Sequence, residues 1–172
     1  MKIPHDPNEV LAIVDKKDKV VGKDIRKNIH DKFLIHREVA IFLINKRKVL
    51  LQKRVDDGKW DTSCAGHFSF DQDYEDAAIR ELKEELNLDI KIEDLEFLKK
   101  VFLTNNKNNQ RFVKVFILKT NISEKDIVFD KSEVSDIKYF SLKQIKDLLK
   151  HDKLITSGVK TLLEDLIIDI IK

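Results

Sequence analysis

Short apolar runs, most of them the length of a β-strand, are spread along the chain of 172 residues. The run 38–44 is almost continuously apolar, which predicts a strand buried on both faces. Extended segments are predicted at 10–14, 20–23, 38–44, 49–54, 60–68, 95–104, 111–119 and 133–140. Asn, Asp and Lys fill the turns between them, since the chain has only 4 Gly and 2 Pro.

Helical spacing replaces the strand pattern in three places. At about 73–86, Leu82 and Leu86 share one face, Asp73 is a candidate N-cap, and Asn87 can end the helix in a left-handed conformation. Two more helices are predicted, at 142–149 and at 157–171, the second being amphipathic.

Strands and helices do not alternate regularly along the chain, which favours an α+β fold over a doubly wound one. We expect one mixed β-sheet with helices packed on it. No linker or repeat divides residues 1–172, so a single domain is predicted, with 1–8 as a flexible lead-in.

The predicted helix at 73–86 carries three glutamates on one side. Glu81, Glu84 and Glu85 span an arc of roughly 100°, because an α-helix advances about 100° per residue. Like charges at this spacing repel each other. A hard divalent cation, which prefers oxygen ligands, would offset that repulsion. An ordinary solvated acidic face is the alternative, and the glutamate spacing alone does not exclude it.

Composition narrows the possible partners. Charged residues make up 37% of the chain, but the net charge is only +2, which gives no electrostatic basis for binding nucleic acid. One cysteine rules out an internal disulfide. No apolar run approaches the roughly 20 residues that span a bilayer, and the N-terminus has no apolar signal region. We therefore expect a cytoplasmic protein without membrane or nucleic acid partners.

The stretch 66–88 resembles the Nudix box, G-x5-E-x7-R-E-U-x-E-E-x-G-U, in which U is a bulky apolar residue. The residues that match at the required spacing are Gly66, Arg80, Glu81, Leu82, Glu84, Glu85 and Leu88. Gln72 stands where the box has its first Glu, and Asn87 where it has its second Gly. This resemblance implies a Nudix-like mixed β-sheet sandwiched between helices.

Surrounding segments are similar to the branch of the Nudix superfamily that is related to isopentenyl-diphosphate isomerase. These segments are 51–54, 58–63, 65–67 and 132–134. The resemblance extends over most of the chain, from about residue 10 to residue 149.

The resemblance implies hydrolysis of a diphosphate bond in a nucleoside diphosphate linked to another group, with Mg²⁺ or Mn²⁺ as cofactor. Glu84 and Glu85 correspond to metal ligands, Glu81 to a ligand or to a residue that orients one, and the carbonyl of Gly66 to a further ligand. Glu81 and Glu84 are thus also candidate catalytic residues. Glu133, which lies outside the box, is the candidate general base.

Five cations are candidates for contacts with substrate phosphate, because arginine forks and lysine ammonium groups bind phosphate oxygens. They are Arg37, Lys53, Arg54, Lys59 and Arg111. We rank Arg54 first because it follows a strand in a family-like segment, and we retain Arg37 with it. His67, next to Gly66, is a further candidate substrate-binding residue.

An isomerase-like activity is the first alternative. The isomerase that this chain resembles uses a cysteine immediately before the Gly-His pair and glutamates on a later strand. Here that position is Ala65, Cys64 lies one residue earlier and is expected on the opposite face, and 109–113 has no glutamate. The histidines that resemble its metal ligands are His30, His36 and His67.

A catalytically weak module that binds a nucleotide-type ligand is the second alternative. Gln72 keeps an oxygen but lacks the charge of the Glu in the box, which predicts weaker metal binding. The apolar face of 157–171 is expected to pack either on the body of the protein or on a second copy, so a homodimer is also possible.

Overall fold

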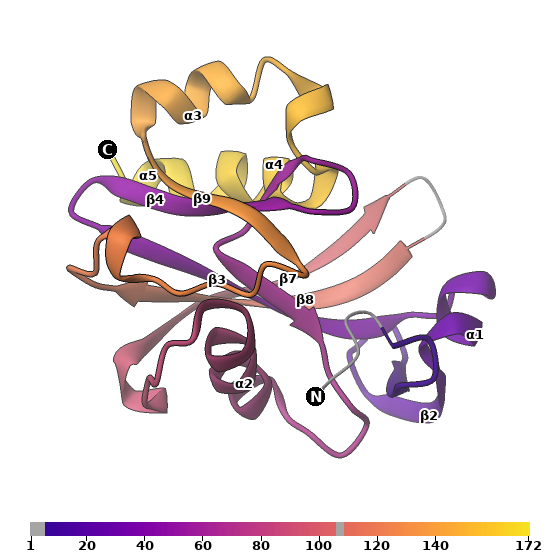
Figure 1. Ribbon diagram of the computed structural model, residues 1–172. Helices are drawn as coiled ribbons and strands as arrows, with labels where there is room; N and C mark the ends of the chain where they lie inside the picture. The colour runs from indigo at the N-terminus through magenta and orange to yellow at the C-terminus, as the bar shows by residue number, and fades with distance from the viewer. Residues whose placement is uncertain (1–5, 106–108) are drawn as a thin grey trace.

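A mixed sheet forms the centre of the protein, which a computed structural model describes for residues 6–105 and 109–172 (Figure 1). Residues 1–5 of the expected lead-in lie outside these ranges. The strands of the sheet are β3 (His36–Asn45), β4 (Lys48–Arg54), β5 (Trp60–Asp61), β6 (Cys64–His67), β7 (Leu95–Asn105), β8 (Asn109–Lys119) and β9 (Val134–Ser141). The main path runs β5-β4-β3-β8-β7, with β6 paired to β3 and β9 to β4. Among the strand pairs of the described residues, β3 and β8 pair in parallel and the others antiparallel, so the sheet is mixed, as expected.

Strand β3 confirms the prediction of burial on both faces. Val39 and Ile41 are fully buried in the core on one side of the sheet, and Ala40 and Phe42 in the core on the other. Successive side chains of a strand point to opposite faces, so a strand between two cores must be apolar at every position. A sheet with helices on both faces confirms the α+β class.

Helices cover the two faces of this sheet. In Figure 1, α2 lies on one side, and α3 to α5 lie on the other. The helical segments are α1 (Arg26–Asp31), α2 (Tyr74–Leu86), η1 (Ile92–Asp94), η2 (Glu124–Asp126), α3 (Leu142–Leu148), η3 (Asp152–Leu154), α4 (Ser157–Leu162), the π-helical turn η4 (Leu163–Ile167) and α5 (Ile168–Ile170). Within the described ranges, none of them is both long and apolar enough to cross a bilayer.

The ends of α2 follow the local signals in the sequence. The side chain of Asp73 accepts a hydrogen bond of 2.8 Å from the backbone N–H of Asp76, and Asn87 adopts φ 52° after the last turn. Leu82 and Leu86 are fully buried against the sheet. This packing leaves the glutamate side of α2 next to β6, where the candidate site begins.

The C-terminal helical segment packs on the body of the protein. Val159, Leu163 and Ile167 are buried in the same core as Phe42 of β3. The apolar face predicted at 157–171 is therefore largely used within the chain. A homodimer stays a prediction.

A separate hairpin, β1 (Val10–Val14) and β2 (Val20–Ile25), is attached to the sheet through Asp18 at its turn. The Asp18 carboxylate accepts hydrogen bonds from Arg37 Nε at 2.7 Å, Lys100 Nζ at 2.5 Å and the Tyr74 hydroxyl at 3.2 Å. Asp18 itself is 8% exposed. This buried, charged junction joins the hairpin to β3, β7 and α2, and it engages the guanidinium of Arg37.

Candidate active site

A pocket of about 560 Å³ collects residues from many parts of the chain. Glu81 and Glu85 reach it from α2, Gly66 from β6, and Glu133 from the segment just before β9. A pocket of this size is typical of sites for small molecules. Sequence spacing predicted that Gly66, Glu81 and Glu85 would meet, and the fold adds Glu133 to the same wall.

Gly66 is required by the close approach of Glu81. A Cβ atom at Gly66 would lie 2.3 Å from Glu81 Oε1, far inside contact distance. The same oxygen lies 2.7 Å from Arg80 Nη2, which also donates to the carbonyl of His67 at 3.1 Å. Glu81 is thus fixed between the backbone of β6 and the guanidinium of Arg80.

Glu85 is a buried carboxyl group of the pocket with a perturbed pKa. It is 4% exposed, and its Oε2 atom has no hydrogen-bond partner within the described residues. Burial, together with the charges of Glu81 and Glu133, raises the pKa of Glu85 well above its usual value. A buried oxygen without a partner, beside two further carboxylates, fits Mg²⁺ or Mn²⁺, which both accept oxygen ligands.

Glu84 has a different position from its two neighbours. It is exposed, it does not line the pocket, and its Oε2 lies 2.7 Å from Arg80 Nη1. Arg80 and Glu84, four residues apart on α2, thus form an ion pair. Direct coordination of a metal by Glu84 would require that pair to break. Glu84 as a ligand stays a prediction.

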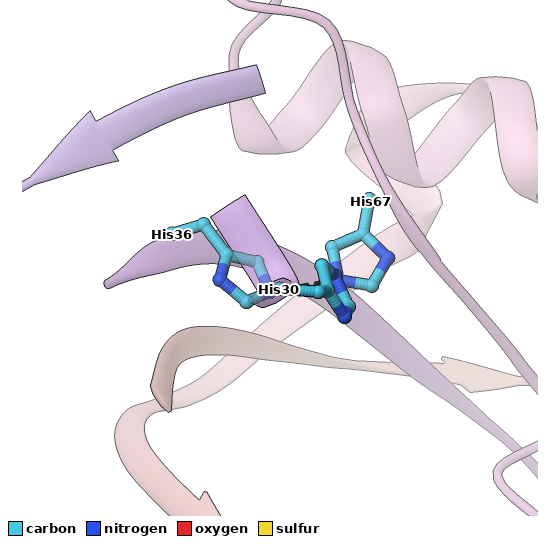
Figure 2. A group of neighbouring side chains, drawn as sticks. All are labelled: His30, His36 and His67. Carbon is cyan, nitrogen blue, oxygen red and sulfur yellow. Dashed lines mark hydrogen bonds between the residues drawn. The ribbon is translucent and has the colours of Figure 1, made fainter. Parts of the chain in front are cut away.

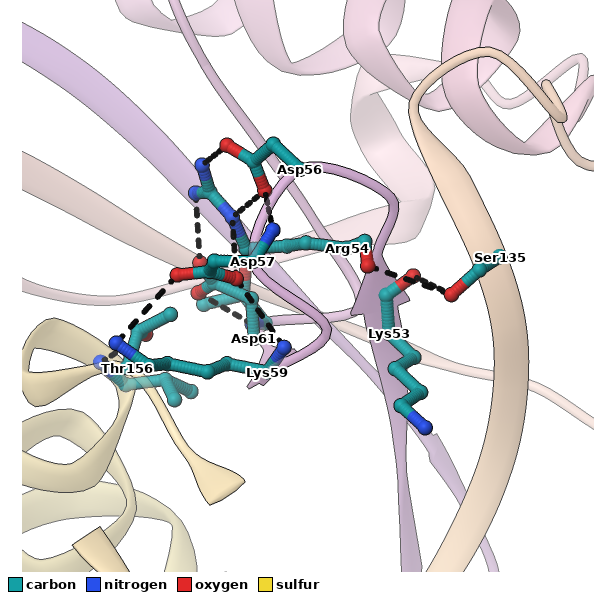
Figure 3. A network of polar contacts seen from close by, with 10 residues as sticks. Lys53, Arg54, Asp56, Asp57, Lys59, Asp61, Ser135 and Thr156 are labelled. Carbon is teal, nitrogen blue, oxygen red and sulfur yellow. Dashed lines mark hydrogen bonds and ion pairs between the residues drawn. The ribbon is translucent and has the colours of Figure 1, made fainter. Parts of the chain in front are cut away.

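Arg54 lines the pocket at the end of β4, surrounded by aspartates (Figure 3). Its Nε donates to Asp56 at 2.9 Å, and its nitrogens lie 3.4 Å from carboxylate oxygens of both Asp57 and Asp61. Hydrogen bonding to Asp56 is the main cause that raises the pKa of Arg54. A substrate phosphate must compete with these aspartates, so binding through Arg54 stays a prediction. Arg37, paired with Asp18, lies outside this pocket.

Three histidines form a cluster at another side of the pocket (Figure 2). His30 comes from α1, His36 from β3 and His67 from β6, and one nitrogen of each lies within 4.8 Å of the others. His36 Nδ1 lies 3.0 Å from the Leu34 carbonyl, so it carries the hydrogen. His36 Nε2 therefore accepts from His67 Nε2, 2.9 Å away.

The histidine cluster is uncharged at neutral pH. Burial lowers the pKa of His36 to about 4 and that of His67 well below its usual value. Neutral imidazoles are the form that binds transition metals, so the donor set fits such an ion. His67, the predicted site residue, lines the pocket together with His30.

Glu38 and Arg26 are pocket residues that the sequence interpretation missed. Glu38 lies within an otherwise apolar strand, and this charge was the available signal. Its Oε2 forms an ion pair of 2.5 Å with Arg111 Nε on the neighbouring strand. Burial raises the pKa of Glu38 despite this cation. Burial lowers the pKa of Arg26, and the charges of four glutamates act against this shift, so Arg26 lies near carboxylates. These are Glu9, Glu38, Glu81 and Glu133.

Gln72 does not share the pocket with Glu85. It lines a separate recess of about 360 Å³ with Arg80 and Glu9. The box has a glutamate at this position, and its replacement by Gln72 therefore does not alter the carboxylates that line the pocket beside Gly66.

Comparison with known proteins agrees with this geometry. The NUDIX domain model matches residues 34–158, which is most of the chain. The protein belongs to the Nudix family. It is 33% identical over 151 residues to isopentenyl-diphosphate Delta-isomerase 2 of Photorhabdus laumondii, with 84% of each chain covered. It is 38% identical over 97 residues to an uncharacterized Nudix hydrolase of a Nostoc species, covering 52% of this chain and 57% of that one.

Solved structures of other proteins have the same fold. The DR0079 protein of Deinococcus radiodurans matches with a TM-score of 0.75 and 21% identity, over 91% of this chain and 97% of that one. Dihydroneopterin triphosphate pyrophosphohydrolase of E. coli matches with a TM-score of 0.60 and 19% identity, over 77% and 95% of the two chains. This Nudix protein is thus related to isopentenyl-diphosphate isomerases as well as to Nudix hydrolases.

The strand β6 separates this Nudix protein from the isomerase pattern described above. Cys64 is fully buried in the core beneath α2, whereas Ala65 lines the pocket. The predicted opposite orientation of these neighbours is confirmed. The position that holds the isomerase cysteine therefore presents only a methyl group to this pocket.

Proposed function

We propose that this Nudix protein is a metal-dependent hydrolase that cleaves a diphosphate bond in a nucleoside diphosphate linked to another group. The convergence of Glu81, Glu85 and Glu133 on one pocket beside Gly66 carries this proposal. Three carboxylates at one site repel each other, and a divalent cation offsets that repulsion while it keeps positions for diphosphate oxygens.

The protein groups have distinct roles in this proposal. Glu81 and Glu85 hold the metal, with the Gly66 carbonyl as a further ligand, and Arg80 keeps Glu81 in position. A bound Mg²⁺ or Mn²⁺ neutralises the diphosphate and lowers the pKa of bound water. Glu133 lines the same pocket and is the proposed base that accepts the proton of the attacking water.

The proposal is tested by the release of two phosphate monoesters, a nucleoside monophosphate and the phosphorylated second group, from nucleoside diphosphate derivatives with Mg²⁺ or Mn²⁺. Nucleoside triphosphates and prenyl diphosphates are tested in parallel for release of phosphate or diphosphate. Release should stop on chelation and return with metal. Glu85→Gln should abolish it, whereas Glu93→Gln, the same change at an exposed glutamate outside the pocket, should not. Ligand binding without turnover at any metal concentration would instead identify a binding module, and equal rates in wild type and Glu85→Gln would refute the assigned site.

An isomerase-like activity is the second candidate, favoured by the cluster of His30, His36 and His67. Two features oppose it: Ala65 replaces the expected cysteine, and Arg111 brings a positive charge close to these histidines. Incubation with isopentenyl diphosphate distinguishes the two reactions. Isomerisation moves a double bond and releases no phosphate, whereas hydrolysis releases phosphate.

A further inference from the structure

Arg111 is a cation in the wall of the pocket, where it pairs with Glu38. Strand β8, which carries Arg111, pairs with β3, and β3 pairs with β6, which carries Gly66. Arg111 is opposite His36 and Gly66 is opposite Val39, so the two residues lie two strands apart and three residues apart along β3. With strands about 4.8 Å apart and about 3.3 Å per residue, their backbones are separated by roughly 14 Å. Arg111 and the proposed metal ligands would thus contact different parts of a bound molecule.

The guanidinium of Arg111 is held in place on two sides. Its Nε pairs with Glu38 Oε2 at 2.5 Å, and a Cβ atom at Gly158 would lie 2.8 Å from its Nη2. The whole residue is only 8% exposed. Gly158, at the start of α4, therefore leaves room for the guanidinium that a larger residue would remove.

The N–H groups on the two Nη nitrogens of Arg111 can donate hydrogen bonds to a ligand. Within the described residues, Glu38 is the one ion-pair partner found for this side chain, and it contacts Nε. A buried cation is costly unless its donors are satisfied. The planar fork of arginine matches carboxylate and phosphate oxygens.

The surroundings of Arg111 favour an anion on a compact, partly apolar group. Leu103 and Val159 line the same pocket, and Leu103 Cδ1 lies 3.9 Å from the Cβ position of Gly158. Arg26 also lines the pocket, but it lies near Glu38, Glu81 and Glu133, whereas Arg111 lies beside Leu103 and Gly158. The guanidinium of Arg111 can therefore bind a negative group at this apolar side.

We propose that Arg111 determines substrate specificity by binding a second anionic group, a carboxylate or a phosphate, at the end of the substrate remote from its diphosphate. This inference rests on the proposed hydrolase function, in which the carboxylates near Gly66 anchor the diphosphate through the metal. Preferred substrates then carry one anion more than a simple nucleoside diphosphate derivative.

Two pairs of compounds test the proposal because each pair differs mainly in one remote anion. UDP-glucuronate and UDP-glucose differ by a carboxylate, and NADP⁺ and NAD⁺ differ by a phosphate. Dissociation constants are measured by calorimetry with Ca²⁺ in place of Mg²⁺, so that a divalent cation still joins the carboxylates to the diphosphate, and product formation is followed in parallel to check that no turnover occurs. Wild type should prefer the anionic member of at least one pair by about tenfold, the effect of one charge-assisted hydrogen bond. The pair that shows the preference identifies the source of the anion.

Substitutions then assign the preference to Arg111. Arg111→Gln should reduce the ratio of dissociation constants to about one, and Gly158→Ala, which displaces Nη2 but keeps the charge, should reduce it partly. Arg47→Gln, which removes an exposed arginine in the β3–β4 turn, should leave the ratio unchanged. Urea unfolding shows whether each variant is folded. If Arg111→Gln does not fold, the ratio measured for Gly158→Ala tests the proposal in its place.

The proposal is overturned if wild type shows no preference in either pair, or if the preference persists in Arg111→Gln. Release of the phosphate-containing products of hydrolysis is measured separately with Mg²⁺, so that the hydrolase function and the role of Arg111 are tested independently. Release without an anion preference refutes the role of Arg111 alone. An anion preference without any release refutes the hydrolase and leaves Arg111 as a binding residue.

Discussion

Replacing Gly66 by alanine is the most direct perturbation of the candidate metal site, because it changes the geometry of Glu81 without removing a carboxylate. The added Cβ would lie 2.3 Å from Oε1, 2.4 Å from Cδ and 2.9 Å from Oε2 of Glu81. Non-bonded heavy atoms normally stay about 3.5 Å apart, so the carboxylate must withdraw by about 1 Å.

Glu81 has little freedom to absorb this displacement. It is 4% exposed, and its Oε1 lies 2.7 Å from Arg80 Nη2. A displacement of about 1 Å in a catalytic group can lower the rate by about 100-fold. Overpacking of this kind also costs about 1–3 kcal/mol of folding free energy. We therefore expect Gly66→Ala to fold, to bind Mn²⁺ more weakly and to lose most of its activity.

The assay combines three measurements on Gly66→Ala. Electron paramagnetic resonance of free Mn²⁺ gives the dissociation constant of the metal. Release of the phosphate-containing products over a Mg²⁺ titration gives the rate of hydrolysis. Urea unfolding gives the free energy of unfolding. Gly22→Ala is the matched control, since its added methyl group meets only Ile13 Cδ1, at 3.7 Å. It should leave all three values close to those of wild type.

A second substitution distinguishes displacement of Glu81 from general damage. Glu81→Asp shortens the side chain by one methylene and makes room for the new Cβ. The double variant should bind Mn²⁺ more tightly than the sum of the two single effects implies. If folded Gly66→Ala retains wild-type Mn²⁺ affinity and activity, Glu81 does not act from the position described above, and the reasoning fails.

Three further substitutions test separate parts of the structure. Glu84→Gln should lower activity by about 10–100-fold, the usual effect of a group that supports a ligand, because Glu84 contacts Arg80 outside the pocket. Glu85→Gln should abolish activity. If both variants lose the same fraction of activity over a Mg²⁺ titration, the distinction between the two glutamates is wrong. Asp18→Asn should destabilise the protein by about 2 kcal/mol, because hydrogen bonds to charged groups contribute about that much; urea unfolding checks this, and an unchanged midpoint would show that the junction does not stabilise the fold. Gln72→Glu should leave the Mn²⁺ dissociation constant unchanged, because Gln72 lines a different recess; tighter binding would place it in the metal shell.

Local sequence signals predicted α2 and its chemistry well. Asp73 and Asn87 act within a few residues of themselves, so the two ends of the helix could be predicted without knowing the fold. The spacing of Glu81 and Glu85 from Gly66 likewise depends on one strand, one loop and one helix. The same spacing placed Glu84 with them, but only packing showed that Arg80 turns it away from the pocket.

Long-range pairing decided the remaining site residues. The sequence interpretation ranked Arg54 first and retained Arg37 with it. Only the fold showed that the hairpin turn brings Asp18 to Arg37, whereas Arg54 lines the pocket. The ion pair of Glu38 with Arg111 depends on the parallel pairing of β3 with β8, which apolar patterns do not specify.

The sequence by itself determined the Nudix architecture, because apolar periodicity, helix caps and the spacing of the box are all local properties. It also indicated the candidate metal ligands Glu81, Glu84 and Glu85, although only packing separated Glu84 from the pocket. Only the tertiary structure decided that His30, His36 and His67 form one cluster and that Arg111 faces the pocket beside Gly158. Contacts between residues far apart in the chain depend on strand register and on helix packing, and these are set by the burial of the whole core rather than by any one segment.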